Sequence, residues 1–396
     1  MKLKLFLLAT SAVALASCSS DAVVEDNAAG NAIQFSATAN QASRAADYYC
    51  NNALPADFNV WASVGGKQYF ANENFAREGA TTSYKITGGT DRYWPAEEVS
   101  FWALKNHQNQ VWKVNGMTTE FTVDAAAANQ HDLIYAYTKA KRADVTNGQA
   151  PINFRHALSQ IVFQAKNDND NIRVKIDKVE VVNVAGKGVF TLPNGDNVTN
   201  TNVNDHGQAE ASAATAGLGS WKNEAANKTF TTGDFGLKLI NNTVTNLTNN
   251  RFNIAQHEEA TPTHSLLLLP QKIAALDLKD KSKEEVLTAL TSGAHFLVYC
   301  TIQNVAGGNE ADDVYLWANK TNDNVKTKAI AIPVNQTAAD YTWEQGKKYI
   351  YTFNFTTKGH GGFDPGTGED VLIPISFTVT VDDFAKGAEQ NVNVKI

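Results

Sequence analysis

The side chains that most often carry acid–base or metal chemistry are few in this sequence and widely scattered. Among the eight histidines of the 396-residue chain, His257 and His264 fall in a polar loop with Pro262 between them. No helix can place that pair on one face, as a zinc protease requires. His156 follows a strand-like run and is interpreted as a structural histidine. With no Gly-x-Ser-x-Gly elbow and no phosphate-binding glycine loop in the sequence, we expect no catalytic residues, no cofactor and no metal.

An acidic loop at residues 362–370 is the remaining place where a cation could bind. It brings Asp364, Glu369 and Asp370 close together in sequence, but it lacks the alternating ligand spacing of an EF-hand. Pro365-Gly366 reads equally well as part of a tight turn between strands. The sequence leaves a calcium site here open and does not favour one.

The three cysteines indicate export and lipidation more than redox chemistry. Residues 1–17 have a positively charged start and a short apolar run, which predicts a signal peptide. Leu15-Ala16-Ser17-Cys18 resembles the bacterial lipobox, so Cys18 is the predicted lipidation site and a lipid anchor the predicted membrane contact. Export permits a disulfide between Cys50 and Cys300. Because Cys300 lies on the apolar face of a strand-like run, we favour two free thiols.

Composition points to an exported, β-rich protein of two domains. Hydrophobic residues make up 43% of the chain and charged residues only 19%, and the length is too great for one ordinary sandwich. The net charge of -7 is spread along the chain without a basic run, so we expect no nucleic-acid partner. After the signal peptide, no apolar stretch reaches the length of a transmembrane helix.

Short runs of β-branched and aromatic residues separated by turn residues repeat along the chain, as in Phe58-Asn59-Val60-Trp61. They predict an all-β fold with one β-sandwich over residues 45–150 and a second over 151–396. Ser282 and Glu285 have the spacing of a capping box, which predicts one short helix inside the second sandwich.

The N-terminal region before the first sandwich, residues 18–44, combines a tether with a short strand. Residues 19–32 are small, polar and acidic, and they read as a flexible linker. Ile33 and Phe35 follow on one face of a strand-like run. Arg44 then stands alone in an extended link, where an arginine-specific protease could reach it. An ordinary solvated arginine is the default alternative.

The C-terminal region ends in two alternating runs, residues 372–381 and residues 391–396. In the second run Val392, Val394 and Ile396 recur at two-residue steps of about 6.6 Å, the period of one strand face. A strand at the end of a chain needs a partner. The sequence leaves open whether that partner lies in this chain or in another copy.

Several motifs occur together in one order along the chain. They are Tyr93-Trp94-Pro95, Ser100-Phe101-Trp102-Ala103, Asp132-Leu133-Ile134-Tyr135-Ala136, Phe154-Arg155-His156-Ala157-Leu158-Ser159-Gln160-Ile161, Leu267-Leu268-Leu269-Pro270-Gln271 and Trp343-Glu344-Gln345-Gly346-Lys347-Lys348-Tyr349-Ile350-Tyr351. Together with the lipobox, they resemble the fimbrillin family of the Bacteroidales in its Mfa-like branch. The resemblance covers nearly the whole chain after the signal peptide.

This resemblance implies a structural subunit of a surface fimbria, a type V pilus, that mediates cell adhesion. It implies two transthyretin-like β-sandwich domains and an outer-membrane lipoprotein that is trimmed by an arginine-specific protease. Arg44 and Ala45 match the expected cleavage position. The cut would remove the strand of Ile33 and Phe35 and leave an apolar groove with unpaired backbone.

Strand addition from another copy or a related fimbrial subunit would fill such a groove. On this hypothesis the donor residues are Val392, Val394 and Ile396. The alternative is a monomeric surface lipoprotein in which these residues close the second sandwich. Exposed aromatic residues such as Trp112 or Trp317 would then bind a glycan or a host ligand.

Overall fold

The computed structural model describes residues 31–39, 54–105, 117–193, 218–248, 265–307, 310–321, 324–336, 339–358 and 360–383. Within these residues the protein is mostly β-strand and has one α-helix, α1 (Lys283–Leu290). The predicted all-β class and the single short helix are confirmed. Single 3-10 turns lie at Ala127–Asn129, Arg142–Asp144, Thr146–Gly148 and Glu310–Asp312.

Seven strands near the N-terminus pair around a closed barrel in the order β1-β4-β3-β2-β5-β7-β8. They are β1 (Gln34–Ala39), β2 (Asp57–Val64), β3 (Lys67–Arg77), β4 (Ser83–Ile86), β5 (Val99–Lys105), β7 (Ile134–Ala140) and β8 (Gln149–His156). The sequence predicts a sandwich of separate sheets for this region. The hydrogen bonding instead forms a ring, because β1 pairs on both of its edges.

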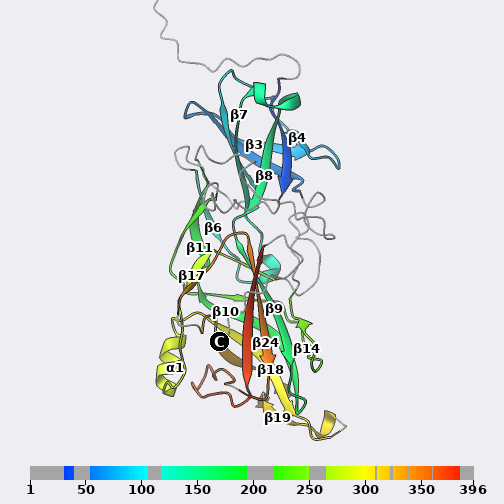
Figure 1. The fold of residues 1–396 in the computed structure, drawn as a ribbon, viewed down its shortest axis with the longest axis vertical. Coiled ribbons are helices and arrows are strands. Elements are labelled where there is room, and N and C mark those ends of the chain that lie inside the picture. The colour runs from blue at the N-terminus through cyan, green and yellow to red at the C-terminus, as the bar shows by residue number, and fades with distance from the viewer. Residues whose placement is uncertain are drawn as a thin grey trace, which may run out of the picture.

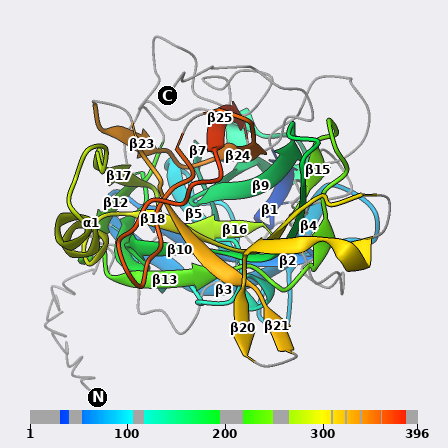
Figure 2. The same ribbon diagram turned by 90° about the horizontal axis from the view of Figure 1, so that it is seen from below.

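The second half of the chain contains two larger sheets on opposite sides of a common core (Figure 2). One sheet comprises β10 (Ile172–Val184), β13 (Lys228–Thr231), β14 (Leu237–Lys238), β18 (His295–Asn304), β19 (Val314–Trp317) and β22 (Lys328–Pro333). The other comprises β9 (Ser159–Asn167), β15 (Thr245–Asn246), β16 (Leu266–Leu268), β24 (Lys347–Phe355) and β25 (Ile375–Asp383). Phe296 of the first sheet lies 4.7 Å from the ring of Tyr351 and 5.4 Å from that of Phe163, both in the second sheet.

Three small sheets complete the fold. They pair β6 (Thr118–Thr122) and β12 (Ser220–Asn223) with β11 (Lys187–Thr191), β17 (Gln271–Ile273) with β23 (Tyr341–Trp343), and β20 (Asn319–Thr321) with β21 (Asn324–Lys326). The hairpin of β20 and β21 projects from the body (Figure 2).

The barrel lies at one end of the long axis and the two large sheets at the other (Figure 1). The sequence pattern assigns residues 152–165 to the opening strands of a second domain. In the structure β8 belongs to the barrel, and β9 belongs to a large sheet. The change of sheet therefore falls at Ala157 and Leu158, a few residues beyond the predicted boundary near residue 150. β6 crosses this line, since it pairs with β11 and not with the barrel.

The two largest apolar cores lie inside the barrel and between the two large sheets. Alternate residues of β5 point to different cores: Phe101 and Ala103 belong to the barrel core, whereas Trp102 and Leu104 belong to the core between the large sheets. The strands of the barrel therefore supply side chains to both cores. This shared packing couples the barrel to the larger sheets.

The helix α1 begins with the capping box that the sequence predicts. Ser282 Oγ accepts a hydrogen bond from the Glu285 amide, and the Glu285 carboxylate accepts one from the Ser282 amide. Val286 and Leu290 of the helix are buried in a third small core. The cap satisfies amides at the helix start that have no partner within the helix.

Replacing Ser282 with alanine should therefore lower the free energy of unfolding by about 1 kcal/mol, the usual loss for a removed N-cap. Urea denaturation followed by fluorescence measures this change. Ser292→Ala, at an exposed position just past the helix, is the matched control and should be neutral. Equal effects of the two substitutions would contradict the role of the cap.

Candidate assembly site

The site that the sequence singles out is the first strand of the barrel. In β1 and the residue before it, Ile33, Phe35 and Ala37 are 2%, 0% and 0% exposed. Gln34 and Ser36 between them are only partly buried. This alternation is the pattern of a strand with one face in a core, and Ile33 and Phe35 share that face as predicted.

Backbone hydrogen bonding inserts β1 between two strands that are distant in sequence. On one side β1 runs parallel to β8, with six paired positions from Gln34 opposite Gln149 to Ala39 opposite Phe154. On the other side it runs antiparallel to β4, with the Ala37 amide 2.9 Å from the Thr82 carbonyl oxygen. Without β1, the edges of β4 and β8 would face each other across a slot one strand wide.

Phe35 occupies the centre of an aromatic cluster inside the barrel. Its ring packs edge-on against three phenylalanine rings, with centroid distances of 4.8 Å to Phe75, 5.1 Å to Phe101 and 5.9 Å to Phe58. These partners come from β3, β5 and β2. Edge-to-face pairs add to the free energy gained by burial. Phe35 therefore anchors β1 to strands on the far side of the barrel.

A buried tyrosine borders the same slot. Tyr84 of β4 lies directly opposite Phe35 and is 0% exposed. Burial raises the pKa of its hydroxyl, which stays protonated and donates a 2.6 Å hydrogen bond to the Pro55 carbonyl oxygen. Tyr84 is thus held by a contact outside β1, and this wall of the slot does not depend on the strand.

Residues just before β1 are tied to the rim of the barrel. The Ile33 amide donates to the Arg92 carbonyl oxygen at 2.7 Å, and the Trp94 amide donates to that of Asn31 at 3.0 Å. Arg142 Nε donates to Asn31 Oδ1 at 2.8 Å. These contacts involve only a few residues, so the strand's retention depends mainly on β1 itself.

The other predicted residues of this process lie outside the described residues. They are Cys18, Arg44, Ala45, Cys50, Val392, Val394 and Ile396. Arg44 falls in the sequence between Ala39, where β1 ends, and Asp57, where β2 begins. A cut after Arg44 would therefore separate β1 from the rest of the barrel in the covalent chain.

The last described strand stays in its own sheet. β25 pairs antiparallel with β24 at nine consecutive positions, from Ile375 opposite Phe355 to Asp383 opposite Lys347. This fits the interpretation of residues 373–381 as a strand of the second half. Within the described residues β25 pairs with β24 alone, so it forms an edge of the sheet.

Other residues noted in the sequence have structural roles. Cys300 is a buried free thiol whose pKa is raised by burial. His156 Nδ1 and the Asp132 carboxylate form a buried pair that the sequence analysis did not anticipate. Trp317 is only partly buried, donates to the Lys328 carbonyl oxygen at 3.1 Å and stacks under the Lys328 ammonium. Within the described residues no group of histidine, cysteine, aspartate and glutamate could hold a metal ion.

The acidic loop is organised by its own contacts. The Asp364 carboxylate accepts hydrogen bonds from Lys328 Nζ and, at 2.9 Å, from the Gly366 amide. Lys283 Nζ lies 2.6 Å from the Glu369 carboxylate. Two of the acidic side chains in this loop thus already have cationic partners within the protein.

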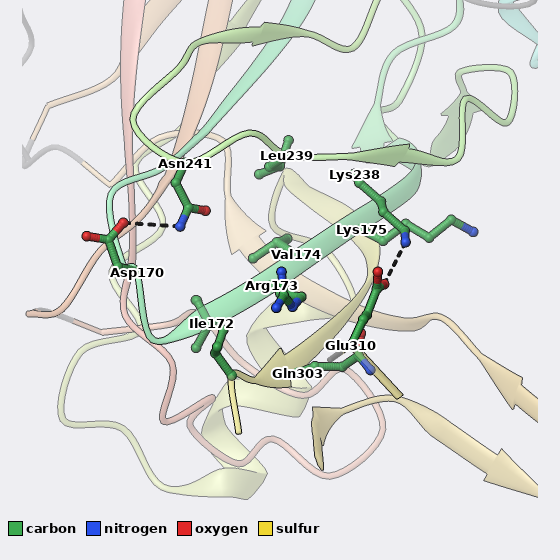
Figure 3. Close-up of a pocket in the computed structure, with 11 residues that line it drawn as sticks. Asp170, Ile172, Arg173, Val174, Lys175, Lys238, Leu239, Asn241, Gln303 and Glu310 are labelled. Carbon is green, nitrogen blue, oxygen red and sulfur yellow. Dashed lines mark hydrogen bonds and ion pairs between the residues drawn. The ribbon is translucent and has the colours of Figure 1, made fainter. Parts of the chain in front are cut away.

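A hollow of about 310 Å³ lies where β10 begins and β18 ends (Figure 3). The side chains that line it bind mainly to each other. Lys238 Nζ lies 2.6 Å from the Glu310 carboxylate, and Asn241 Nδ2 donates to Asp170 Oδ1 at 3.1 Å. Arg173 Nε is 2.6 Å from the Asp313 carboxylate. The polar groups of this hollow are therefore largely satisfied without a ligand.

These features define an all-β protein whose barrel is closed by β1, the first strand among the described residues. The model of the fimbrillin-like family matches residues 22–381, and the chain belongs to this family. Such proteins act in fimbriae and adhesion and are generally not enzymes. Membership supports a role as a fimbrial subunit, association with other subunits and a surface-exposed location.

Solved structures of proteins from Bacteroides species are similar to the chain. One is a protein of Bacteroides uniformis proposed to act in cell adhesion, with 13% identity, a TM-score of 0.48, and coverage of 90% of this chain and 100% of that one. Another is a fimbrial protein of Bacteroides vulgatus, with 11% identity, a TM-score of 0.47, and coverage of 89% and 99%. Comparison with curated proteins gave no significant match.

Among the described residues, no helix is long and apolar enough to cross a membrane.

The packing of Phe35 predicts that the barrel depends on it. Phe35→Ala should lower the free energy of unfolding by about 3–5 kcal/mol, because it removes a large buried ring and leaves a cavity among three others. Urea denaturation of the uncut chain measures the loss. Ser36→Ala, on the outward side of the same strand, should change stability by less than about 0.5 kcal/mol. A Phe35→Ala loss as small as that of Ser36→Ala would contradict the anchoring role.

Proposed function

We propose that this protein is a structural subunit of a surface fimbria that is assembled by strand exchange after proteolytic trimming, and that it takes part in cell adhesion. It is exported as an outer-membrane lipoprotein with acyl chains on Cys18. An arginine-specific protease then cuts between Arg44 and Ala45. The strand that carries Ile33 and Phe35 leaves the barrel, and a strand from another subunit replaces it.

The observation that supports this proposal most strongly is the position of β1. It is the first described strand, it precedes Arg44 in the sequence, and it pairs on both edges with strands of the barrel. Its departure would expose two strand edges and an apolar slot at once. Such a slot is unfavourable in water and favours capture of another strand.

The donor strand in this proposal consists of Val392, Val394 and Ile396. β25 remains paired with β24, so the residues after Asp383 are the part of the C-terminal region that is free to be donated without breaking the described sheet. Apolar residues at every second position suit the alternating pockets of a strand groove.

A monomeric surface lipoprotein that binds a glycan or a host ligand is the alternative function. The described hollow near Arg173 and Glu310 gives it little support, because ion pairs within the protein occupy its polar groups. N-terminal sequencing of the surface-shed protein separates the two functions. A start at Ala45 supports assembly, and an intact acylated Cys18 supports an anchor subunit or an independent lipoprotein.

Removing the cleavage site or the donor should block assembly at different stages. Arg44→Ala should give an uncut lipoprotein that stays out of fimbriae, since β1 remains covalently attached. Deleting residues 391–396 should give a trimmed, folded subunit that cannot donate a strand to the slot of a neighbouring subunit. Immunoblots of sheared surface fimbriae and N-terminal sequencing measure both effects. Normal polymers from either variant would refute the corresponding step, and Arg77→Ala controls for loss of an arginine inside the barrel.

A disulfide between β1 and β4 should lock the strand in place. Ser36 and Ser83 lie directly opposite each other. Since the adjacent Ala37 amide bonds to Thr82, this pair occupies the closer, non-hydrogen-bonded position, with Cα atoms about 4.5 Å apart. That spacing permits a disulfide.

We expect Ser36→Cys with Ser83→Cys, in a Cys50→Ala background, to be cut after Arg44 but to keep its β1 fragment and stay out of fimbriae until a reductant is added. Native gels with mass spectrometry of the retained fragment give the readout. Ser83→Cys alone is the control and should assemble normally. Assembly of the oxidised double variant at the normal rate would rule out departure of β1.

A further inference from the structure

The inward pockets of the β1 slot differ in size, and this limits which strand can replace β1. Ile33, Phe35 and Ala37 fill three successive positions along the slot and are all at most 2% exposed. The middle position holds an aromatic ring, whereas the third holds a single methyl group. A replacing strand must fit these three volumes in order.

The middle pocket has walls that do not come from β1. Phe58 of β2 also packs against Phe154 at 4.8 Å and against Tyr84 at 4.7 Å. Phe101 of β5 packs against Trp94 at 5.6 Å. Contacts to the rest of the barrel thus hold two of the rings that surround Phe35. The space left by Phe35 therefore persists as a ring-sized cavity.

The C-terminal run of this chain does not match these pockets. Val392, Val394 and Ile396 contain no aromatic residue, and in either direction Val394 falls in the middle pocket when all three are filled. A valine there leaves part of the ring-sized space empty, which is costly in a packed core. The residue placed at the Ala37 position is a valine or an isoleucine, and excess volume at a fully buried site is also unfavourable.

Another run in this chain does have the required spacing. Ile375, Phe377 and Val379 repeat the aliphatic–aromatic order of Ile33 and Phe35, with a valine at the position of Ala37. This run lies in β25, which is hydrogen-bonded to β24 at nine positions. Its donation would strip an edge strand from the second half of the chain, so it is not available to a neighbouring subunit.

We infer that the slot of this subunit selects a donor strand with an aromatic residue at the middle inward position, and that its occupant is the C-terminal strand of a different fimbrial subunit and not a second copy of this chain. The matching donor has an aliphatic residue two positions to one side of the aromatic residue and a small residue two positions to the other. This inference rests on the proposed strand exchange and adds which kind of subunit donates the strand.

A peptide competition assay tests the selectivity. The chain is made with a specific protease site in place of residues 42–46 and is cut after folding, so that the β1 fragment stays in its slot until a peptide displaces it. The competitors are residues 31–39, the same peptide with Phe35→Val, and residues 389–396 with and without Val394→Phe. Fluorescence of a labelled β1 fragment reports its release.

We expect the unchanged β1 peptide to compete best and the Phe35→Val peptide to compete roughly tenfold or more less well, as expected for partial emptying of a buried aromatic site. Val394→Phe should improve the tail peptide by a similar factor. Ser36→Val in the β1 peptide is the matched control, and because this side chain points outward it should change competition by less than about threefold.

Competition by the unchanged tail peptide equal to that of the β1 peptide would overturn the selectivity while leaving strand exchange intact. So would a Phe35→Val peptide that competes as well as the original. If no peptide, including β1 itself, displaces the fragment, the slot does not open, and both strand exchange and the selectivity are refuted.

Discussion

The closure of the barrel by β1 is the contact on which the rest of the proposed assembly depends. A strand that forms hydrogen bonds on both edges and buries Phe35 among aromatic rings holds the ring of seven strands together. The same strand lies at the start of the described chain and is joined to β2 only through the segment that contains Arg44. The strand that stabilises the barrel is therefore also the strand that one cut in the chain would detach. A barrel closed by an internal strand could not lose it through a single cut.

Hydrogen bonds at the junction between the barrel and the large sheets hold these two parts of the protein together. Tyr135 of β7 accepts a hydrogen bond from the Gly219 amide at 3.0 Å and donates one to Gln345 Oε1 at 3.1 Å. Gln345 Nε2 in turn donates to the Gly219 carbonyl oxygen at 2.7 Å. Three segments far apart in sequence are tied together in this way. Mutually satisfied polar groups of this kind favour one arrangement over others, so a change in β1 need not loosen the sheets beyond.

The features that the sequence predicted correctly are those that depend on residues close together in the chain. Alternation identified the inward face of Ile33 and Phe35, and the Ser282 to Glu285 spacing identified the start of the helix, because both depend on neighbours within a few residues. The parallel pairing of β1 with β8 joins positions about 115 residues apart in the sequence, and no short pattern encodes it. The same holds for the break after His156 between barrel and sheet. The role of Ala37 was missed although it continues the alternation, since one methyl group gives little apolar signal.

The direction of β25 constrains how a neighbouring subunit can be reached. β25 runs back toward the barrel, because Asp383 pairs with Lys347 and the Gly346 amide bonds to the Leu158 carbonyl oxygen at the junction. Thirteen residues follow Asp383, and the proposed donor uses the last five. The other eight span at most about 28 Å when extended. In the proposed assembly the accepting slot must therefore begin within that distance of Asp383. The slot that accepts this tail belongs to another subunit in the proposed assembly, and the short spacer would hold that subunit close to the donor's junction.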